Sequence, residues 1–304
     1  MEDHPDSRSG IRADTGRSPQ TFLVTGATGN IGRRVVAGLL AAGHRPRAFV
    51  RNAEKARQLL GGSVELITGD LGDETALASA CAGVRGIFLL AGGADLAAID
   101  ARAARAARAG GVGHIVKLSS MGGRAAGAAT AIAQWHANGE DAIRASGVPH
   151  VFVRSVGFMS NALAWAPTIK AAGIVRASTG DGRIAMIHPD DVAEVSVRAL
   201  LAGPGADEVL CVTGPEPLTY AQMTAKLAAI LGRPLTFAAI SDDSAVESLL
   251  AVGMPLPVAH ALVALWREVR EGAVDLVSPD VQRITGHRPR SFEQWAAENA
   301  PAFR

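Results

Sequence analysis

The chain has 304 residues, of which 48% are hydrophobic and 19% charged, so it has enough apolar material for one large domain or two joined domains and is not a disordered chain. Its formal net charge of +1 argues against a dedicated nucleic-acid-binding protein, which needs a concentrated basic face. The two cysteines, Cys81 and Cys211, lie far apart in the sequence. They predict neither a disulfide framework nor a zinc site and suit a reducing compartment.

The first twenty residues are polar and charged, and they lack the apolar run of about 7–15 residues that a secretory signal needs. We expect residues 1–20 to form a disordered tail. No later segment reaches the roughly 18 consecutive apolar residues that suggest a membrane span. The prediction is therefore a cytoplasmic protein with no membrane partner and, given its net charge, no nucleic-acid partner.

Strands and helices are expected to alternate strictly from residue 21 onward. The first strand, residues 21–25, is short, apolar and β-branched, as is typical of a strand buried on both faces. Helices are expected at 31–42, 53–60, 74–81, 94–109 and 132–146, and further strands at 45–50, 64–68, 86–90, 115–119 and 150–154. This order predicts an α/β fold, a doubly wound parallel Rossmann sheet. Ligands of such sheets bind beyond the carboxyl ends of the strands.

The alternation loosens after residue 155, which predicts two regions. Residues 21–155 are expected to form the dinucleotide-binding domain, and 156–304 a smaller, mostly helical substrate-binding region or lid, with one strand near 209–213 returning to the sheet. Helices are expected at 219–231 and 243–270. Within 249–269, apolar residues at helical spacing are interrupted by Gly253, Pro255 and Pro257. A bent helical pair of this kind suits a lid or the contact of a homodimer.

A glycine-rich turn follows the first strand and opens a helix, with the spacing G-x-x-G-x-x-G at Gly26, Gly29 and Gly32. Gly26 permits the tight turn, Gly29 lets a pyrophosphate approach the backbone, and Gly32 allows the helix to pack closely on the strand. The phosphates would meet free N–H groups at the positive end of the helix. The alternative is a glycine turn without a ligand.

Other strand ends suggest the rest of the cofactor site. Where an enzyme that uses NAD usually has an acidic residue, this chain has Arg51, whose planar fork can pair with a 2′-phosphate; this favours NADPH over NADH. The alternative is a solvated arginine. Asp70 and Leu71 can meet the adenine, or Asp70 can cap the next helix. Ala91 and Gly92 are small enough for a nicotinamide ribose to pass, or form a simple turn.

Seven segments of the sequence resemble the NmrA-like branch of the atypical short-chain dehydrogenase/reductases. They lie within residues 21–198 and read TGATGNIG, VRN, GDL, KLSSMG, WHANGEDAIRASGV, RSVGFMSN and HPDDVAE. The resemblance implies pyrophosphate contacts by Gly26, Thr28, Gly29, Asn30 and Ile31. It implies that Ser119, Ser120 and Met121 flank the nicotinamide, and that Val156, Gly157 and Phe158 form its far wall. The family includes quinone and dye reductases, ketoreductases of secondary metabolism and non-catalytic regulators.

The Tyr-x-x-x-Lys pair of most short-chain dehydrogenases is missing, because the single tyrosine, Tyr220, lies far downstream. The helix expected at 132–146 instead carries His136 and Glu140, four residues apart on one face. His136 is a candidate proton donor or substrate partner, and Glu140 would orient it or bind the cofactor. The alternative is a pair that braces the helix. Ser119 is a candidate donor to a substrate oxygen, or satisfies local backbone. The other histidines show no ligand spacing, so no metal site is predicted.

A flat, apolar slot for the substrate is the last expectation. Its candidate lining residues are Met121, Phe158, Met159, Asn161, Trp165 and Trp266, although each apolar one also fits an ordinary core. The sequence thus predicts an NADPH-dependent reductase that delivers hydride to an aromatic ketone, quinone or related conjugated acceptor, in a tailoring step of secondary metabolism. The alternatives are a non-catalytic dinucleotide sensor and a cofactor-assisted isomerase or cyclase.

Overall fold

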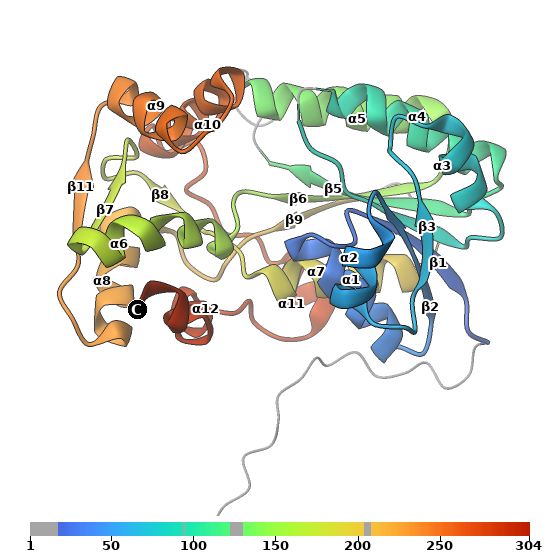
Figure 1. The fold of residues 1–304 in the computed structure, drawn as a ribbon, viewed down its shortest axis with the longest axis horizontal. Helices are drawn as coiled ribbons and strands as arrows, with labels where there is room; N and C mark the ends of the chain where they lie inside the picture. Colours follow the sequence, from blue (N-terminus) through green and yellow to red (C-terminus); the bar gives the residue numbers. More distant parts are fainter. Residues whose placement is uncertain (1–17, 94, 122–129, 204–207) are drawn as a thin grey trace, which may run out of the picture.

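Seven parallel strands form the central sheet of the molecule (Figure 1). The computed structural model describes residues 18–93, 95–121, 130–203 and 208–304, so most of the expected tail lies outside it. In spatial order the strands are β3 (Glu65–Thr68), β2 (Arg45–Val50), β1 (Thr21–Thr25), β4 (Gly86–Leu89), β5 (His114–Ser120), β6 (His150–Ser155) and β9 (Glu208–Val212). The predicted α/β, doubly wound parallel fold is confirmed.

Helices cover both faces of this sheet. One face carries α1 (Asn30–Ala41), α2 (Ala53–Leu60) and α7 (Pro189–Ala202), and the other carries α3 (Glu74–Cys81), α4 (Leu96–Ala109) and α5 (Ala131–Ser146). The period-2 alternation of a strand explains the two cores: Phe22 and Val24 of β1 pack on the first face, and Leu23 packs on the second. Helix starts are fixed locally, since Asn52, Asp73 and Thr130 cap α2, α3 and α5.

The C-terminal half contributes to the sheet as well as forming a second unit. Helix α7 packs beside α1, β9 pairs with β6, and α11 (Asp280–Thr285) lies against both α7 and β9. The free edge of β9 is partly closed, because the backbone N–H of Cys211 donates to Asp280 at 2.8 Å. A hydrogen bond of this kind leaves fewer unpaired groups for another strand to join.

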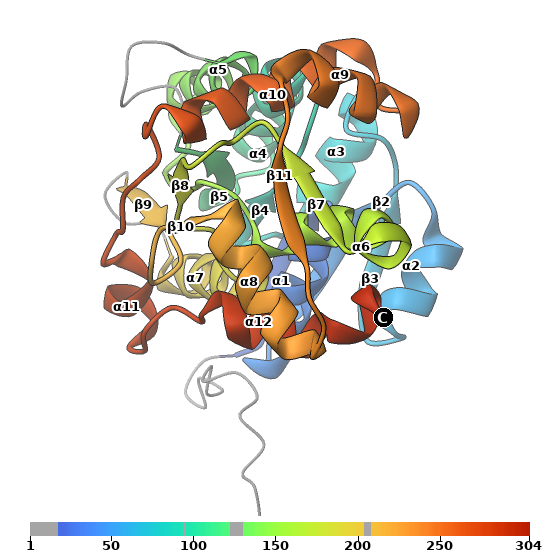
Figure 2. The ribbon, with the colours of Figure 1, turned by 90° about the vertical axis from the view of Figure 1, so that its left-hand side faces the viewer.

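The second unit has its own apolar core. It comprises η1 (Met159–Trp165), α6 (Ala166–Ala172), β7 (Ile174–Ala177), β8 (Arg183–Ile184), β10 (Leu218–Thr219), α8 (Tyr220–Leu231), β11 (Thr236–Ala239), α9 (Asp242–Ala251), α10 (Leu256–Arg270), α12 (Phe292–Asn299) and η2 (Ala300–Phe303). Strands β8 and β10 pair antiparallel, while β7 and β11 pair parallel (Figure 2). The small strands β7, β8, β10 and β11 were not anticipated from the sequence, because two to four residues carry too little periodicity.

Aromatic side chains fill the centre of this second unit. The ring centroids of Trp165 and Tyr220 lie 5.1 Å apart, and those of Phe292 and Trp295 lie 5.5 Å apart, with the rings tilted in both pairs. Helices α9 and α10 form a bent pair at one end of the unit, and α10 contacts α5 of the main sheet. The pair therefore lies next to α5, one of the helices that cover the second face of the central sheet.

Candidate cofactor and active site

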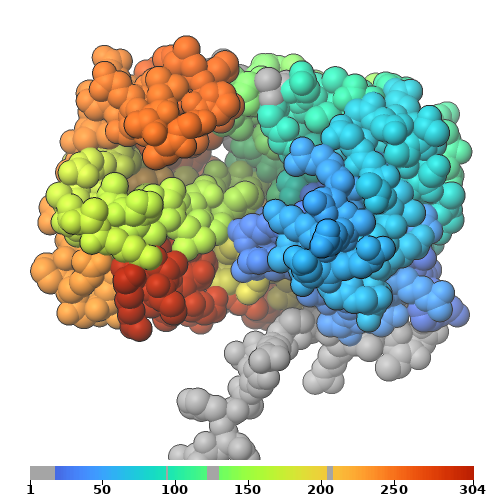
Figure 3. Space-filling model, in the orientation of Figure 1, coloured from blue at the N-terminus to red at the C-terminus, as the bar shows by residue number. Residues whose placement is uncertain are grey.

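The site is built at the carboxyl edge of the sheet, between the two units. The chain order reverses between β1 and β4, and in doubly wound sheets the ligand crevice opens at such a switch point. The space-filling view shows a hollow in this region, with α1 and α2 on one side and α6, α9 and α10 on the other (Figure 3).

The glycine loop after β1 has the geometry that its spacing predicts. Gly26 has φ +61°, in the region that favours glycine, and the N–H of Gly29 donates to the Gly26 carbonyl at 2.9 Å. A Cβ on Gly32 would lie 2.2 Å from that same carbonyl oxygen. Gly32 is therefore the position at which α1 passes closest to the turn, and a side chain there would push the helix away.

The N-terminus of α1 is open to an anion. Its cap residue, Gly29, provides no side-chain hydrogen bond, and the first turn contains no acidic residue. The first N–H groups of the helix, at Asn30, Ile31 and Gly32, have no partner within the helix and sit at the positive end of its dipole. A pyrophosphate is the kind of group that satisfies such donors, so the loop fits a dinucleotide.

The side chain of Asn30 is already engaged. Its amide donates to Ser160 at 2.8 Å, and its oxygen accepts from Arg34, which also binds Asp190 at 2.5 Å. This network ties the glycine loop to η1 and α7 of the C-terminal half. Asn30 is thus in a position to serve a dinucleotide through its backbone N–H, while its side chain holds the two units together.

Two arginines are exposed near the expected adenosine end. Arg51 follows β2, and Arg33 lies in the first turn of α1; neither forms an ion pair with a described residue. Asp70, at the end of β3, is exposed, and its carboxylate accepts from the N–H of Gly72 at 2.8 Å. The alternative in which Asp70 caps the next helix is wrong, because Asp73 caps α3. Leu71 is half-buried beside it.

The end of β4 is fixed to the end of β1. Thr25 Oγ1 donates to the Leu90 carbonyl at 2.9 Å and accepts from the Leu90 N–H at 2.8 Å. Of the next residues, Ala91 is half-buried and Gly92 is exposed, and a Cβ on Gly92 would meet nothing within 4 Å. Small side chains thus leave the backbone accessible at the centre of the edge.

The ends of β5 and β6 carry a buried polar cluster. Ser119 Oγ donates to Glu140 at 2.7 Å, Arg154 donates to both oxygens of Glu140 at 2.8 and 2.5 Å, and Arg144 adds a contact at 3.1 Å. Burial alone would raise the pKa of Glu140, but the bonds from Arg154 and Ser119 lower it below its ordinary value. Glu140 is therefore an ionised brace between α5, β5 and β6 and has no proton to donate.

His136 lies one turn before Glu140, near the end of α5 that meets the carboxyl edge of the sheet. Burial, with a further contribution from Lys117 and opposed by Glu140, lowers the pKa of His136 to about 4. Its Nδ1 atom is buried and has no hydrogen-bond partner among the described residues. The imidazole is neutral at pH 7, so it suits hydrogen bonding better than proton donation.

The segment after β6, which we expect to be the wall opposite the nicotinamide, is held in place by backbone hydrogen bonds. Gly157 accepts from the Ile187 N–H at 2.8 Å, and the N–H of Met159 donates to the Ile187 carbonyl at 2.9 Å. Val156, Gly157 and Phe158 are half-buried, as are Ser120 and Met121 at the end of β5. The Met121 N–H donates to the Ser155 carbonyl at 3.0 Å, so these strand ends are held together.

The expected substrate residues separate into two groups. Met159 and Trp165 are 1% and 8% exposed and belong to the apolar core of the second unit, so the structure favours the core interpretation for both. Phe158 and Trp266 are half-buried, and Asn161 is exposed. Tyr220 is 4% exposed in the same core, and burial raises its pKa. The single tyrosine is thus inaccessible as an acid.

Two other features lie near the site. His188, Asp190 and Glu298 place possible ligand atoms within 4.8 Å of one another. However, His188 uses both ring nitrogens, toward the Asp190 N–H and Glu298, and Asp190 binds Arg34.

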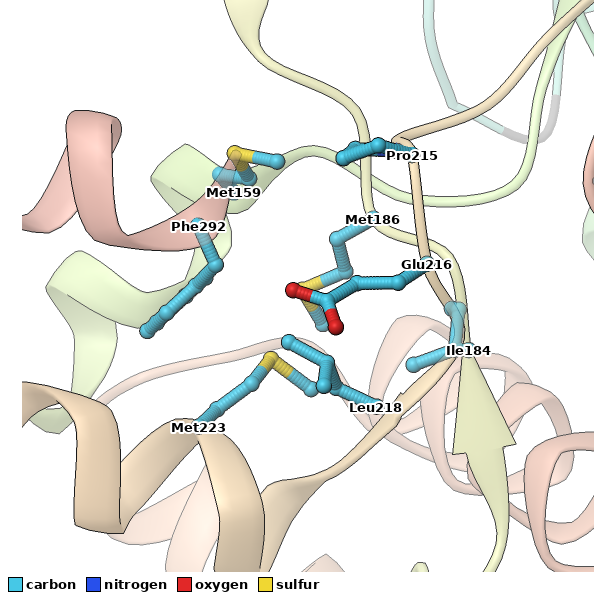
Figure 4. A pocket seen from close by; sticks show the side chains of 8 residues that line it. All are labelled: Met159, Ile184, Met186, Pro215, Glu216, Leu218, Met223 and Phe292. Atoms are coloured by element: carbon cyan, nitrogen blue, oxygen red, sulfur yellow. The ribbon is translucent and has the colours of Figure 1, made fainter. Parts of the chain in front are cut away.

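A small pocket beside η1 is lined by Met159, Ile184, Met186, Pro215, Glu216, Leu218, Met223 and Phe292 (Figure 4). The Glu216 carboxylate points among these side chains and is also bound by Lys226 at 3.1 Å.

Four residues of the active-site region were missed at the sequence level. Arg154 binds Glu140, and Asp100 of α4 pairs with Lys117 of β5, with Gly139 of α5 directly above. Lys117 stands two residues before Ser119, and this period-2 spacing was the available signal that both face the α4–α5 side. No pattern in the sequence indicated Asp100 or Gly139 as their neighbours, because those contacts join separate helices.

A doubly wound parallel sheet with an uncapped, glycine-lined helix N-terminus at its switch point defines a dinucleotide-binding protein. The chain belongs to the NAD(P)H-binding family, whose model matches residues 26–202. It is 43% identical over 282 residues, 93% of this chain and 99% of the relative, to a (4-alkanoyl-5-oxo-2,5-dihydrofuran-3-yl)methyl phosphate reductase of Streptomyces griseus. It is 32% identical over 283 residues, again 93% and 99%, to an NAD(P)H azoreductase of Xenophilus azovorans.

Among solved structures, the chain resembles an NADPH-dependent quinone oxidoreductase of Escherichia coli complexed with NADPH. The TM-score is 0.82 at 26% identity, over 91% of this chain and 99% of that one. The expected family, an atypical short-chain dehydrogenase/reductase type, is confirmed, and the protein is an NAD(P)H-dependent oxidoreductase. None of the helices in the described ranges is long and apolar enough to cross a membrane.

Proposed function

We propose that the protein is an NADPH-dependent reductase of a small conjugated carbonyl compound. The observation that carries this proposal is the state of the single tyrosine, which is buried in the aromatic core of the C-terminal half. A reductase of an isolated ketone needs an acid to protonate the new alkoxide. A conjugated acceptor spreads the incoming charge over several atoms, so a hydrogen bond to its oxygen and a proton from water are sufficient.

The cofactor supplies the hydride when it is bound. In this proposal the N–H groups at the start of α1 hold the pyrophosphate, with Gly26, Thr28 and Gly29 forming the turn beneath it. Arg51, exposed and without an ion-pair partner among the described residues, provides the fork for a 2′-phosphate and so favours NADPH. Asp70 and Leu71 lie at the adenine end.

The nicotinamide end uses the strand ends at the centre of the edge. Ala91 and Gly92 leave room for the ribose, Ser120 and Met121 flank the ring, and the segment 156–158 forms the opposite wall. Ser119 directs its proton to Glu140, so it can offer a substrate only an accepting lone pair. His136 is the residue of this cluster that we assign as hydrogen-bond donor to the substrate oxygen, with Ser120 beside it.

The relatives support a conjugated acceptor. The reductase that is 43% identical over nearly its whole length is named for an alkanoyl-substituted unsaturated lactone phosphate. The other two relatives are named for azo compounds and quinones, in which a hydride also enters a conjugated system. We therefore propose an alkanoyl butenolide, or an acceptor with the same conjugated carbonyl, as the substrate. A reaction of this kind would be a tailoring step in the synthesis of a secondary metabolite.

The test is NADPH oxidation at 340 nm, after calorimetry has established cofactor binding. The panel contains an alkanoyl butenolide phosphate, its dephosphorylated form, a naphthoquinone, an azo dye, an aromatic ketone and a saturated ketone. We expect turnover with the conjugated compounds and at least tenfold lower kcat/KM with the saturated ketone. Deuterium transferred from labelled NADPH would locate the carbon that receives hydride.

The alternatives give different results in the same experiment. A dinucleotide sensor would bind NADPH tightly and reduce none of the compounds. An isomerase or cyclase would change a conjugated substrate without net loss of absorbance at 340 nm. A preference for the saturated ketone would contradict the proposal itself, because it would require an acid that the single buried tyrosine cannot supply.

A further inference from the structure

A fully buried ion pair lies beneath the active-site helix. Lys117 Nζ of β5 is 2.7 Å from Asp100 Oδ2 of α4, and both side chains are 0% exposed. Burying two charges is costly unless each is paired and hydrogen-bonded. Apart from this contact, Lys117 Nζ and both oxygens of Asp100 have no hydrogen-bond partner among the described residues. The pair thus keeps unused donors and acceptors in the protein interior.

Helix α5 has a glycine, Gly139, where it contacts this ion pair. A Cβ on Gly139 of α5 would lie 2.0 Å from Asp100 Oδ2, so only glycine permits the carboxylate to sit against the helix. His136 precedes Gly139 by three residues and therefore lies on the same face of α5. The ion pair is consequently adjacent to the turn of α5 that carries His136.

The imidazole of His136 has a ring nitrogen that is free to accept a hydrogen bond. Its Nδ1 is buried and, among the described residues, has no hydrogen-bond partner. Lys117 and Glu140 are the charged groups that act on it. The oxygens of Glu140 are bound by Ser119, Arg154 and Arg144, so Glu140 is not free to accept from the imidazole.

Charged groups on the elements packed against α5 have partners of their own. On β6, Arg154 is bound to Glu140, and on α10, Glu268 interacts with the backbone of Thr130 at the cap of α5. Lys117 is therefore the cation that acts on His136, and an ammonium group only donates hydrogen bonds. A nitrogen that accepts from it must be unprotonated.

We propose that Lys117, held by Asp100, is a positioning residue that donates to His136 Nδ1 through one buried water. This bond fixes the imidazole as the neutral tautomer with its proton on Nε2. A water here would have polar partners on Lys117, Asp100 and His136, as buried waters require. The arrangement makes His136 a permanent hydrogen-bond donor through Nε2, in place of an acid that gains and loses a proton.

The tautomer can be measured on the protein without substrate. Ring ¹⁵N chemical shifts of His136, assigned with the variant H136Q, should show a proton on Nε2 at pH 7 and no second proton above about pH 5. A proton on Nδ1, or titration near pH 6.5, would overturn the proposal. Because this readout needs neither cofactor nor turnover, it separates the tautomer from the proposed function, on which only the role of the Nε2 proton rests.

A variant tests the part played by the ion pair. Replacing both members, K117M with D100L, avoids leaving one buried charge unpaired. Because the Lys117 charge lowers the pKa of His136, we expect that pKa to rise in the double variant, the tautomer to become mixed, and the acid limb of kcat/KM to move to higher pH with it. The control is K226M, which removes a lysine from the second unit and should leave the His136 spectrum unchanged.

Each outcome of these two experiments either supports or overturns the proposal. An unchanged His136 pKa and tautomer in a natively folded double variant would show that Lys117 acts only in packing, and would overturn the proposal. If the double variant does not fold, the wild-type ¹⁵N spectrum still decides between the Nε2 and Nδ1 tautomers. The expected tautomer, together with the shifted pKa in the variant, would establish Lys117 as the group that sets the state of His136.

Discussion

Ser119 of β5 and Arg154 of β6 are register partners in the parallel sheet, and both donate to the same carboxylate, Glu140 of α5. The register of two strands and the position of one helix thus converge on a single buried anion, which is 2% exposed. A short-chain dehydrogenase with the usual Tyr-x-x-x-Lys pair would use this helix for acid catalysis. Here side chains of β5 and β6 bind the helix through Glu140, and the helix carries His136 in place of that pair.

The first prediction concerns this brace. Substituting Glu140→Gln removes the charge that binds Arg154, leaving a largely buried guanidinium without its counter-ion, and we expect a loss of about 3 kcal/mol in the free energy of unfolding. Urea denaturation of the variant and the wild type measures this loss of stability. Glu247→Gln on the exposed face of α9 is the control and should change stability by less than about 0.5 kcal/mol. Equal effects for the two variants would show that Glu140 does not brace the strands.

The second prediction concerns the glycine loop. A Cβ at position 32 would lie 2.2 Å from the Gly26 carbonyl oxygen, so Gly32→Ala must displace α1 from the turn. We expect a destabilisation of about 1–3 kcal/mol and at least a tenfold weaker affinity for NADPH, measured by denaturation and calorimetry. Gly62→Ala is the matched control, since a Cβ there meets nothing within 4 Å. Native affinity in the Gly32 variant would contradict a pyrophosphate site at this helix.

The third prediction separates the two cofactors. Arg51→Ala should weaken NADPH binding about tenfold or more, because a charge-assisted bond to the 2′-phosphate is lost, and should change NADH binding less than about twofold. Calorimetric titrations with both cofactors provide the measurement. Arg57→Ala, also exposed and in the next helix, is the control. Equal weakening of NADPH and NADH would remove Arg51 from the 2′-phosphate site.

The fourth prediction follows from the pKa of His136, which is lowered from 6.5 to about 4. Between these values the unfolded chain takes up a proton at His136 and the folded protein does not. Stability is therefore lost as the pH falls from about 6.5 to about 4, by about 2 kcal/mol between pH 7 and pH 5. His136→Gln should reduce this acid sensitivity by that amount, measured by urea denaturation at both pH values. His260→Gln, exposed on α10, should retain the full sensitivity.

The fifth prediction concerns the single tyrosine. Tyr220 interacts through its hydroxyl with Trp266 and is buried in the second unit, so Tyr220→Phe should leave kcat within about twofold of the wild type while costing about 1 kcal/mol of stability. Steady-state kinetics with a conjugated substrate give kcat, and urea denaturation gives the free energy of unfolding. A loss of kcat of a hundredfold or more would mean that the tyrosine hydroxyl reaches the reaction after all.

Much of the fold could be predicted from local patterns. The six strands expected between residues 21 and 154 are present, and the glycine spacing located the α1 turn, because strand alternation and the steric needs of glycine act over a few residues. The helix pair α9 and α10 was indicated by helical spacing interrupted by Gly253, Pro255 and Pro257. The helix expected at 74–81 is present with the same bounds, but its cap is Asp73 and not the alternative candidate Asp70.

Sequence by itself determined the class of sheet, the dinucleotide loop and the loss of the catalytic tyrosine, since each depends on residue type and short spacing. Only the tertiary structure decided what Glu140 and Lys117 do. Their partners, Arg154 and Asp100, come from other elements and reach them through strand register and through the space left by Gly139. The charge state of a buried group depends on which other charges the fold brings beside it, and that information is not local in the chain.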